Sequence, residues 1–181
     1  MNIARPLATI ALALCAGRAV AVDAVSIAVD RASGVTGLHG ALVYEWAHGD
    51  AALPRWLDWT GADPRLELGA AVWHAYHDSV ERQTIVGLTA SPMLRWSFDR
   101  MAAGQPFVDF GAGPRLWSGT HLGARHRFGT AFEFGTTLGL GLRRSGYDVF
   151  MRVEHTSNGG IRQPNTGINF LQLGLAFELG R

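Results

Sequence analysis

Three polar residues near the C-terminus have side chains that could carry out chemistry together. In VEHTSNGGIRQPNTGINF, residues 153–170, His155, Ser157 and Asn158 occur within four positions. Residues i and i+2 of a strand share a face, so the imidazole of His155 could accept the proton of the Ser157 hydroxyl, as in a serine esterase. The same spacing also fits two interface residues that join a strand to its loop. Spacing alone leaves both interpretations open.

The N-terminal residues have the features of a secretory signal. A positive charge at Arg5 precedes a short apolar segment, and an A-x-A cleavage site ends at Ala21. We therefore expect a signal peptide over residues 1–21 and a single domain over residues 22–181. The only cysteine, Cys15, belongs to the signal. The mature chain is thus expected to use no disulfide, no thiolate metal site and no cysteine nucleophile.

The charged residues argue against a nucleic-acid partner. The formal net charge is +1, and all 16 basic residues are arginine. A soluble protein with no lysine on its surface would be unusual, whereas arginine suits paired and confined positions. A transmembrane helix needs about eighteen consecutive apolar residues. No segment after the signal has such a run, so no transmembrane helix is expected.

Alternation with a period of two runs through the mature chain and predicts an all-β fold. Between residues 168 and 180, leucines alternate with small or polar residues such as Gln172 and Gly174. Pro92 interrupts one such run and predicts a bulge. The 47–62 connector is the longest and has room for a helical turn. The expected strands are 24–33, 36–46, 64–75, 83–98, 106–117, 126–142, 146–157 and 168–180.

Residue size on the two faces indicates which kind of barrel these strands form. The polar face consists mainly of Gly, Ala, Ser and Thr, which suit the lumen of a small closed barrel, and the other face carries Leu, Val and Phe, which suit lipid. A soluble lipid-carrying barrel would need the small residues outside. We expect Trp46, Trp73, Trp96 and Trp117 to form an interfacial girdle. Charges expected to pair in the lumen are Arg65, Arg95, Arg127 and Arg152 with Glu67, Asp109, Glu133, Glu154 and Glu178.

The prediction is an eight-stranded antiparallel transmembrane β-barrel of a bacterial outer membrane, because eight strands of about 9–11 residues fit the mature length. If the N-terminus starts in the periplasm, the seventh strand ends at the extracellular side. Its phase directs His155 and Ser157 toward lipid in the outer leaflet, and Arg152 and Glu154 into the lumen.

The polar stretch also resembles a known family. His155-Thr156-Ser157-Asn158-Gly159-Gly160-Ile161, with Gln163-Pro164-Asn165 and Gly167-Ile168, resembles the signature of PagL-type lipid A 3-O-deacylases, and PFVDFGAGPRLWSGT (106–120) resembles that family's fifth strand. The resemblance implies an outer-membrane barrel with a Ser-His-Glu triad on its outer surface that cleaves the 3-position ester of lipid A. It assigns Ser157 as nucleophile, His155 as general base and Asn158 to the oxyanion hole.

One position departs from the family pattern. The family's acid stands fourteen residues after the histidine, where this sequence has Asn169. Asn169 has the phase of the lipid-facing leucines, so it is expected on the same lipid-facing side as His155. An amide can fix the imidazole tautomer, but it cannot stabilise the imidazolium as a carboxylate does.

Two functions follow for a barrel of this kind. The first is a lipid A esterase that releases a 3-hydroxy fatty acid from lipopolysaccharide in the outer leaflet. Arg162 of the loop could contact phosphate or sugar oxygens of that substrate or could be a solvated loop residue, and spacing leaves both open. The second is a non-catalytic structural or adhesive barrel, which Asn169 favours. No histidine shows convincing ligand spacing with carboxylates, so we expect no metal and no other cofactor.

Overall fold

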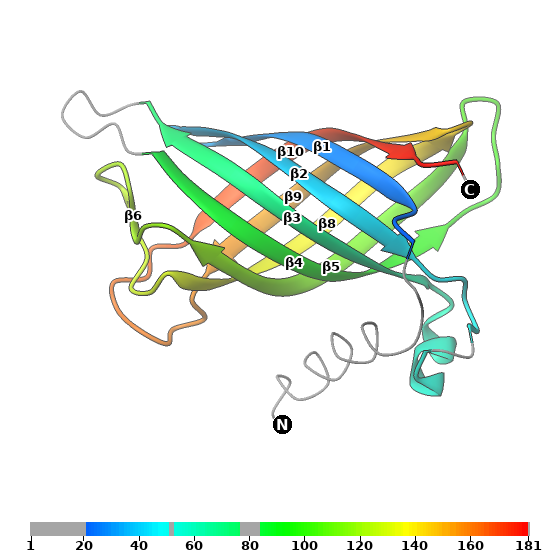
Figure 1. The fold of residues 1–181 in the computed structure, drawn as a ribbon, viewed down its shortest axis with the longest axis horizontal. Helices are drawn as coiled ribbons and strands as arrows, with labels where there is room; N and C mark the ends of the chain where they lie inside the picture. Colours follow the sequence, from blue (N-terminus) through cyan, green and yellow to red (C-terminus); the bar gives the residue numbers. More distant parts are fainter. Residues whose placement is uncertain (1–20, 51–52, 77–83, 181) are drawn as a thin grey trace.

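The computed structural model describes residues 21–50, 53–76 and 84–180, so the predicted signal peptide, except for Ala21, lies outside the described residues. Eight strands close into an antiparallel barrel in the order β1-β10-β9-β8-β5-β4-β3-β2, which confirms the predicted architecture (Figure 1). The strands are β1 (Ala24–Ala32), β2 (Val35–Glu45), β3 (Asp63–Ala75), β4 (Thr84–Ser97), β5 (Gln105–Trp117), β8 (Phe132–Arg144), β9 (Tyr147–Ser157) and β10 (Ile168–Glu178).

The two ends of the barrel carry different connections. At the hairpin end, the short strands β6 (His121–Leu122) and β7 (His126–Arg127) pair with each other beside the loop 158–167. The start of β1 and the end of β10 lie at the other end of the barrel, the connector end. The connector between β2 and β3 is there too, and it contains the 3-10 helix η1 (Arg55–Thr60) (Figure 1). No described helix is long and apolar enough to span a membrane.

The wall has an apolar outside and a polar, small-residue inside. Outward residues such as Leu88, Leu138 and Leu173 are exposed, whereas inward residues such as Ser26 and Thr89 are buried. The strict alternation in β9, exposed then buried along its length, shows this pattern most clearly. The apolar outer face is the face that lipid covers in a membrane barrel.

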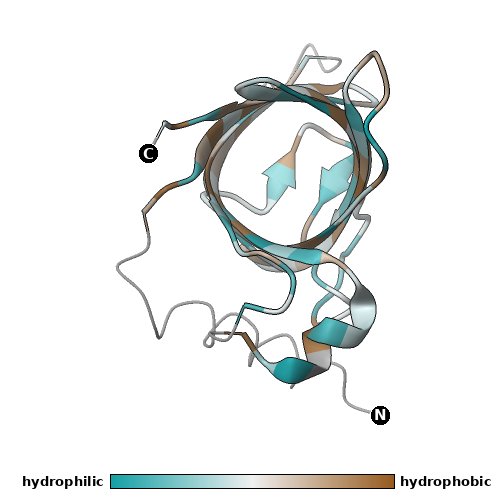
Figure 2. Cartoon of the chain, turned by 90° about the vertical axis from the view of Figure 1, so that its right-hand side faces the viewer, coloured by the Kyte–Doolittle hydropathy of each residue, from teal (hydrophilic) through white to brown (hydrophobic). Residues whose placement is uncertain are grey.

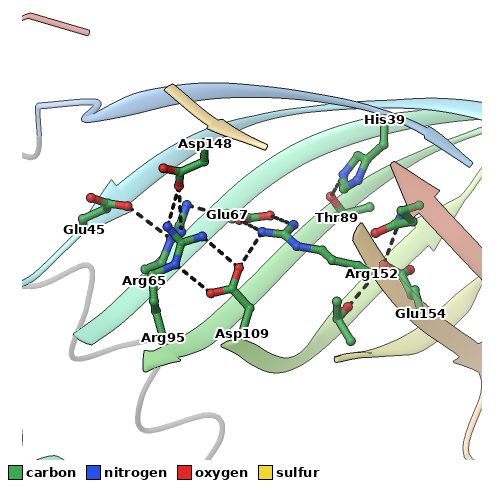
Figure 3. A network of polar contacts seen from close by, with 12 residues as sticks. His39, Glu45, Arg65, Glu67, Thr89, Arg95, Asp109, Asp148, Arg152 and Glu154 are labelled. Carbon is green, nitrogen blue, oxygen red and sulfur yellow. Dashed lines mark hydrogen bonds and ion pairs between the residues drawn. The ribbon is translucent and has the colours of Figure 1, made fainter. Parts of the chain in front are cut away.

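Charged side chains fill the lumen toward the connector end. Arg95 donates to Asp109 at 2.7 Å and pairs with Asp148, while Arg152 donates to both Glu67 oxygens at 2.8 Å (Figure 3). Buried charges are tolerated when they are paired in this way. The prediction of opposite charges in the lumen is therefore confirmed for this cluster.

Two of the charges predicted inside are on the surface instead. Arg127 is exposed on the short strand β7, and Glu178 is exposed at the last position of β10. Glu133 is buried, but it accepts a hydrogen bond from the Thr130 hydroxyl at 3.4 Å and forms no ion pair within the described residues. Alternation with a period of two predicts which face a residue occupies only within a strand of the barrel. Arg127 lies on β7, outside the barrel wall.

Aromatic side chains fill the lumen toward the hairpin end. The rings of Trp73 and Trp117 are 3.7 Å apart between centroids, and Phe170 lies 4.2 Å from Trp73. Trp73 also donates to Asp30 at 2.8 Å. The predicted girdle is therefore wrong for these two tryptophans, because both have the inward phase of their strands. Trp46 is also buried, and only Trp96 is partly exposed.

Two further local predictions are corrected. The run 126–142 is not one strand: β8 begins at Phe132, and Phe128 is buried in the aromatic cluster instead of facing lipid. Pro92 does not cause a bulge, because β4 keeps one register with β5 on both sides of it and pairs with β3 without a break. The helical turn for which the connector had room is η1.

Candidate active site

The pairing of β9 with β10 places Asn169 directly opposite His155. Both side chains are exposed on the outer face of the wall, and the His155 Nδ1 atom lies 2.7 Å from the Asn169 Oδ1 atom. An amide oxygen only accepts hydrogen bonds, so Nδ1 carries the proton in this arrangement. The Nε2 atom of the neutral ring then has a free lone pair.

Ser157 ends β9 on the same outer face, two residues after His155. It is half-buried and lies opposite Phe134 of β8. Among the described residues, its hydroxyl has no hydrogen-bond partner. The serine therefore lies two residues from His155 on one face, and no other described group holds its hydroxyl.

Gly167 shapes the other side of the histidine. Its φ is +60°, a conformation that favours glycine, and a Cβ atom there would lie 3.0 Å from His155 Cε1. A larger residue would push the imidazole away from its place. The glycine thus lets the chain entering β10 pass close to the ring.

The loop 158–167 is organised around Asn158, which is fully buried. Its Nδ2 donates to the Arg162 carbonyl at 2.7 Å, its Oδ1 accepts from the Gly160 N–H at 2.9 Å, and its own N–H donates to Asn165 Oδ1 at 3.2 Å. The side chain of Asn158 therefore holds the loop together. Its predicted oxyanion role stays a prediction, and the side-chain amide would have to leave these partners to fulfil it.

The hairpin β6–β7 supports this loop from the side. Phe128 pairs with Asn165 in an isolated bridge, and the Thr166 N–H donates to the Arg127 carbonyl at 3.1 Å. His126 Nδ1 lies 3.2 Å from the Gly167 carbonyl. Sequence reasoning missed this support because it assigned residues 126–142 to one strand. Gly129 and Thr130, which follow Phe128 and interrupt the strand pattern, were the signal in the sequence that the run 126–142 is divided there.

Arg162, which the sequence suggested as a contact for substrate oxygens, has an exposed side chain in the same loop. Its backbone is fixed, since its carbonyl accepts from Asn158 and packs against Gly129. The guanidinium is therefore presented to solvent from an ordered part of the chain.

Glu154 is the nearest acid to His155 in sequence, but it faces the lumen. Both of its oxygens accept from Arg115 at 3.2 Å, and Thr156 donates to it at 3.1 Å. This confirms the predicted direction of Glu154 and leaves Asn169 as the group beside the histidine. No three potential metal ligands gather anywhere in the described part of the chain.

Fold and site together define a class: a small membrane-embedded β-barrel with serine and histidine on its lipid-facing wall. A family model described as "Lipid A 3-O-deacylase (PagL)" matches residues 45–178, well over half of the chain. The chain belongs to this family. Such a barrel is located in the bacterial outer membrane.

Curated relatives agree with the assignment. Lipid A deacylase PagL of Bordetella bronchiseptica is 33% identical over 122 residues, which cover 67% of this chain and 65% of that protein. Lipid A deacylase PagL of Pseudomonas aeruginosa is 37% identical over 70 residues, 38% of this chain and 40% of that protein. The chain thus matches less than two thirds of the length of either relative.

Solved structures agree on the fold. The crystal structure of the outer membrane enzyme PagL has a TM-score of 0.67 at 22% identity, covering 86% of this chain and 99% of that one. Neisserial surface protein A has a TM-score of 0.53 at 11% identity, covering 90% of this chain and all of that one. At these identities the likeness concerns the barrel alone.

Proposed function

We propose that this protein is a lipid A 3-O-deacylase that hydrolyses the ester-linked acyl chain at the 3 position of lipid A and releases a 3-hydroxy fatty acid. The observation that carries the proposal is the hydrogen bond of 2.7 Å between His155 and Asn169 on the lipid-facing wall. Ser157, half-buried on the same face two residues further on, then stands beside a histidine whose Nε2 is free to accept a proton.

The reaction would proceed in two steps. Ser157 Oγ attacks the ester carbonyl while its proton passes to His155 Nε2, and the tetrahedral intermediate collapses as that proton moves to the departing sugar 3-oxygen. Water then attacks the acyl-serine, gives its proton to His155, and the fatty acid leaves as Ser157 regains its hydrogen. Asn169 keeps the imidazole in the productive tautomer throughout.

The position on the wall fits a substrate that is itself a membrane lipid. Ser157 and His155 lie at the end of β9, where the apolar outer face formed by residues such as Val153 and Leu171 meets the loop 158–167. An acyl chain could lie along the apolar face while its ester reaches the serine. Arg162, exposed in the loop above, would contact phosphate or sugar oxygens.

Asn158 would contribute to the oxyanion hole in this proposal. Because its side chain is bonded within the loop, we assign it a second role, which is to hold the backbone immediately after Ser157 in one conformation. Preorganised N–H donors near a developing oxyanion are among the largest contributions to catalysis in acyl transfer.

The alternative is a non-catalytic outer-membrane barrel, structural or adhesive, derived from the same family. Asn169 favours it, because a neutral amide stabilises the imidazolium less than a carboxylate does. Mass spectrometry of lipid A from cells with and without the protein separates the two. Loss of one 3-hydroxyacyl chain supports the deacylase, whereas an unchanged spectrum in cells with folded protein supports the non-catalytic barrel.

A further inference from the structure

The connector between β2 and β3 lies against the outside of the barrel. Figure 2, viewed along the barrel, shows η1 beyond the ring of strands. Leu53 and Leu57 of the connector are buried, and they pack in one cluster with Leu66 of β3. Leu66 has the outward phase of its strand, the same as the exposed Leu68. The connector therefore covers the end of the apolar outer face.

Neighbouring strands contribute to the same contact. Tyr44 of β2 and Leu94 of β4, both half-buried, pack against the cluster, and both have the outward phase of their strands. Trp96 of β4 donates from its indole nitrogen to the Thr60 carbonyl at 2.9 Å. The last residue of η1 is thus tied to the barrel wall, so the helix is seated on it and not only tethered at its two ends.

Trp59 points away from this contact. It is 80% exposed, more than any other large apolar side chain among the described residues. Phe98 and Met101, in the connection that follows β4 at the same end, are also exposed. An indole is costly to leave in water, but its apolar ring and its N–H suit the membrane–water interface, where tryptophan is enriched.

We propose that η1 is an interfacial anchor, in which Trp59 inserts among the lipid headgroups of the leaflet opposite the one that His155 faces. The argument rests on continuity with the lipid-facing wall. Leu53 and Leu57 cover the last outward residues of that wall. Trp59 therefore lies next to the place where the apolar outer face of the barrel ends. The exposed Asp58 and Arg55 of the same helix would remain in water or near the headgroups.

The anchor fixes the depth of the barrel on one side. Because Trp73 and Trp117 fill the lumen and Trp46 is buried, the described tryptophans form no ring around the wall. A tryptophan held on one side, over β2 to β4, resists vertical movement and tilt of the barrel there. This role does not depend on the chemistry at Ser157, since η1 and Ser157 lie at opposite ends of the barrel.

Fluorescence quenching by brominated lipids tests the anchor. The full mature chain is folded into phosphatidylcholine vesicles with bromines close to the headgroup or deep in the acyl chain, and Trp59→Phe is compared with the natural protein. Trp59→Phe keeps an apolar ring but removes the indole emission. We expect it to lose the component that shallow bromines quench most strongly.

The matched control is Trp117→Phe, which removes a lumen indole. Its loss of emission should leave the lipid-quenched component unchanged. Heat-modifiable migration on gels verifies that both variants are folded, and Trp59→Leu serves as a second variant if Trp59→Phe is not. A Trp59 component that is quenched by aqueous acrylamide and not by brominated lipid would overturn the proposal. Equal shallow quenching of the natural protein and a folded Trp59→Phe would overturn it as well.

Discussion

Polar residues alternate between the two faces of β9. The inner and the outer residues differ in how many hydrogen-bond partners the fold gives them. On the inner face, Arg152 and Glu154 are buried and paired with opposite charges: Arg152 donates to Glu67 at 2.8 Å, and Glu154 accepts from Arg115 and Thr156. On the outer face, His155 has one partner, Asn169, and the Ser157 hydroxyl has none among the described residues.

The difference shows how to distinguish chemistry from structure on a single strand. A buried charge needs an opposite charge beside it, because an unpaired one is costly. A carboxylate such as Glu154, whose two oxygens both accept from an arginine, has little capacity left for a substrate. An outward polar group at the wall is also costly in lipid, unless it lies at the headgroup level or serves a function. His155 and Ser157 are therefore candidates for catalysis, whereas Glu154 is expected to stabilise the folded barrel.

The largest effect is expected from Ser157→Ala. Removing the proposed nucleophile should reduce deacylation by a factor on the order of 10⁴–10⁶, and His155→Ala should do the same, since members of a triad act as one unit. Release of the 3-hydroxy fatty acid in detergent measures it. Thr156→Val, on the inner face between them, is the control and should keep most of its activity. Comparable turnover in Ser157→Ala would exclude the serine-esterase mechanism.

Glu154→Gln tests the inner face. It leaves the buried Arg115 guanidinium without its carboxylate, so the free energy of unfolding should fall by about 3 kcal/mol. Urea titration of the heat-modifiable folded form measures the loss. Activity should follow only the folded fraction. A fully stable Glu154→Gln barrel without activity would mean that Glu154, and not Asn169, acts with His155.

Asn158→Ala tests the loop that follows Ser157. We expect a rate loss of roughly 10²–10³, the usual cost of one oxyanion donor. Loss of its bonds to Arg162 and Gly160 should also make the loop 158–167 more sensitive to protease. A slow enzyme with a loop as protected as the natural one supports direct donation to the oxyanion. Unchanged turnover would remove Asn158 from the mechanism.

Substitutions of Asn169 sharpen the comparison at the histidine itself. Asn169→Glu should be faster than the natural protein by a factor of about five, because a hydrogen bond to a charged group is worth about 1 kcal/mol more than a neutral one. Asn169→Ala should be slower, because the imidazole loses its fixed tautomer. The three rates are measured in the same detergent, and three equal values would show that this position has no catalytic role.

The smallest effect is expected at Arg162. An exposed ion pair contributes about 1 kcal/mol or less, so Arg162→Ala should raise KM for phosphorylated lipid A by no more than about fivefold. The effect should disappear on dephosphorylated lipid A, with kcat unchanged on both. Identical kcat/KM for the variant and the natural protein on phosphorylated substrate would identify Arg162 as a solvated loop residue.

Much of the fold was predictable because alternation with a period of two assigns every residue of a strand to one of two faces. Small residues on one face and leucines on the other then fixed which face meets lipid. The same rule placed His155, Ser157 and Asn169 outside and Glu154 inside, each of which the structure bears out. The rule failed at Phe128, where the alternating run continued past the barrel strand into the hairpin support.

By itself, then, the sequence determined the barrel, its lipid-facing side and the motif that belongs to the family. Only the tertiary structure decided which residues meet across strands. Period two is blind to register, so it could not show that Asn169 stands opposite His155, that Arg115 pairs with Glu154, or that Trp73 stacks on Trp117. Those contacts depend on how β3, β5, β9 and β10 are staggered around the closed wall, and the stagger is set by the packing of all eight strands together.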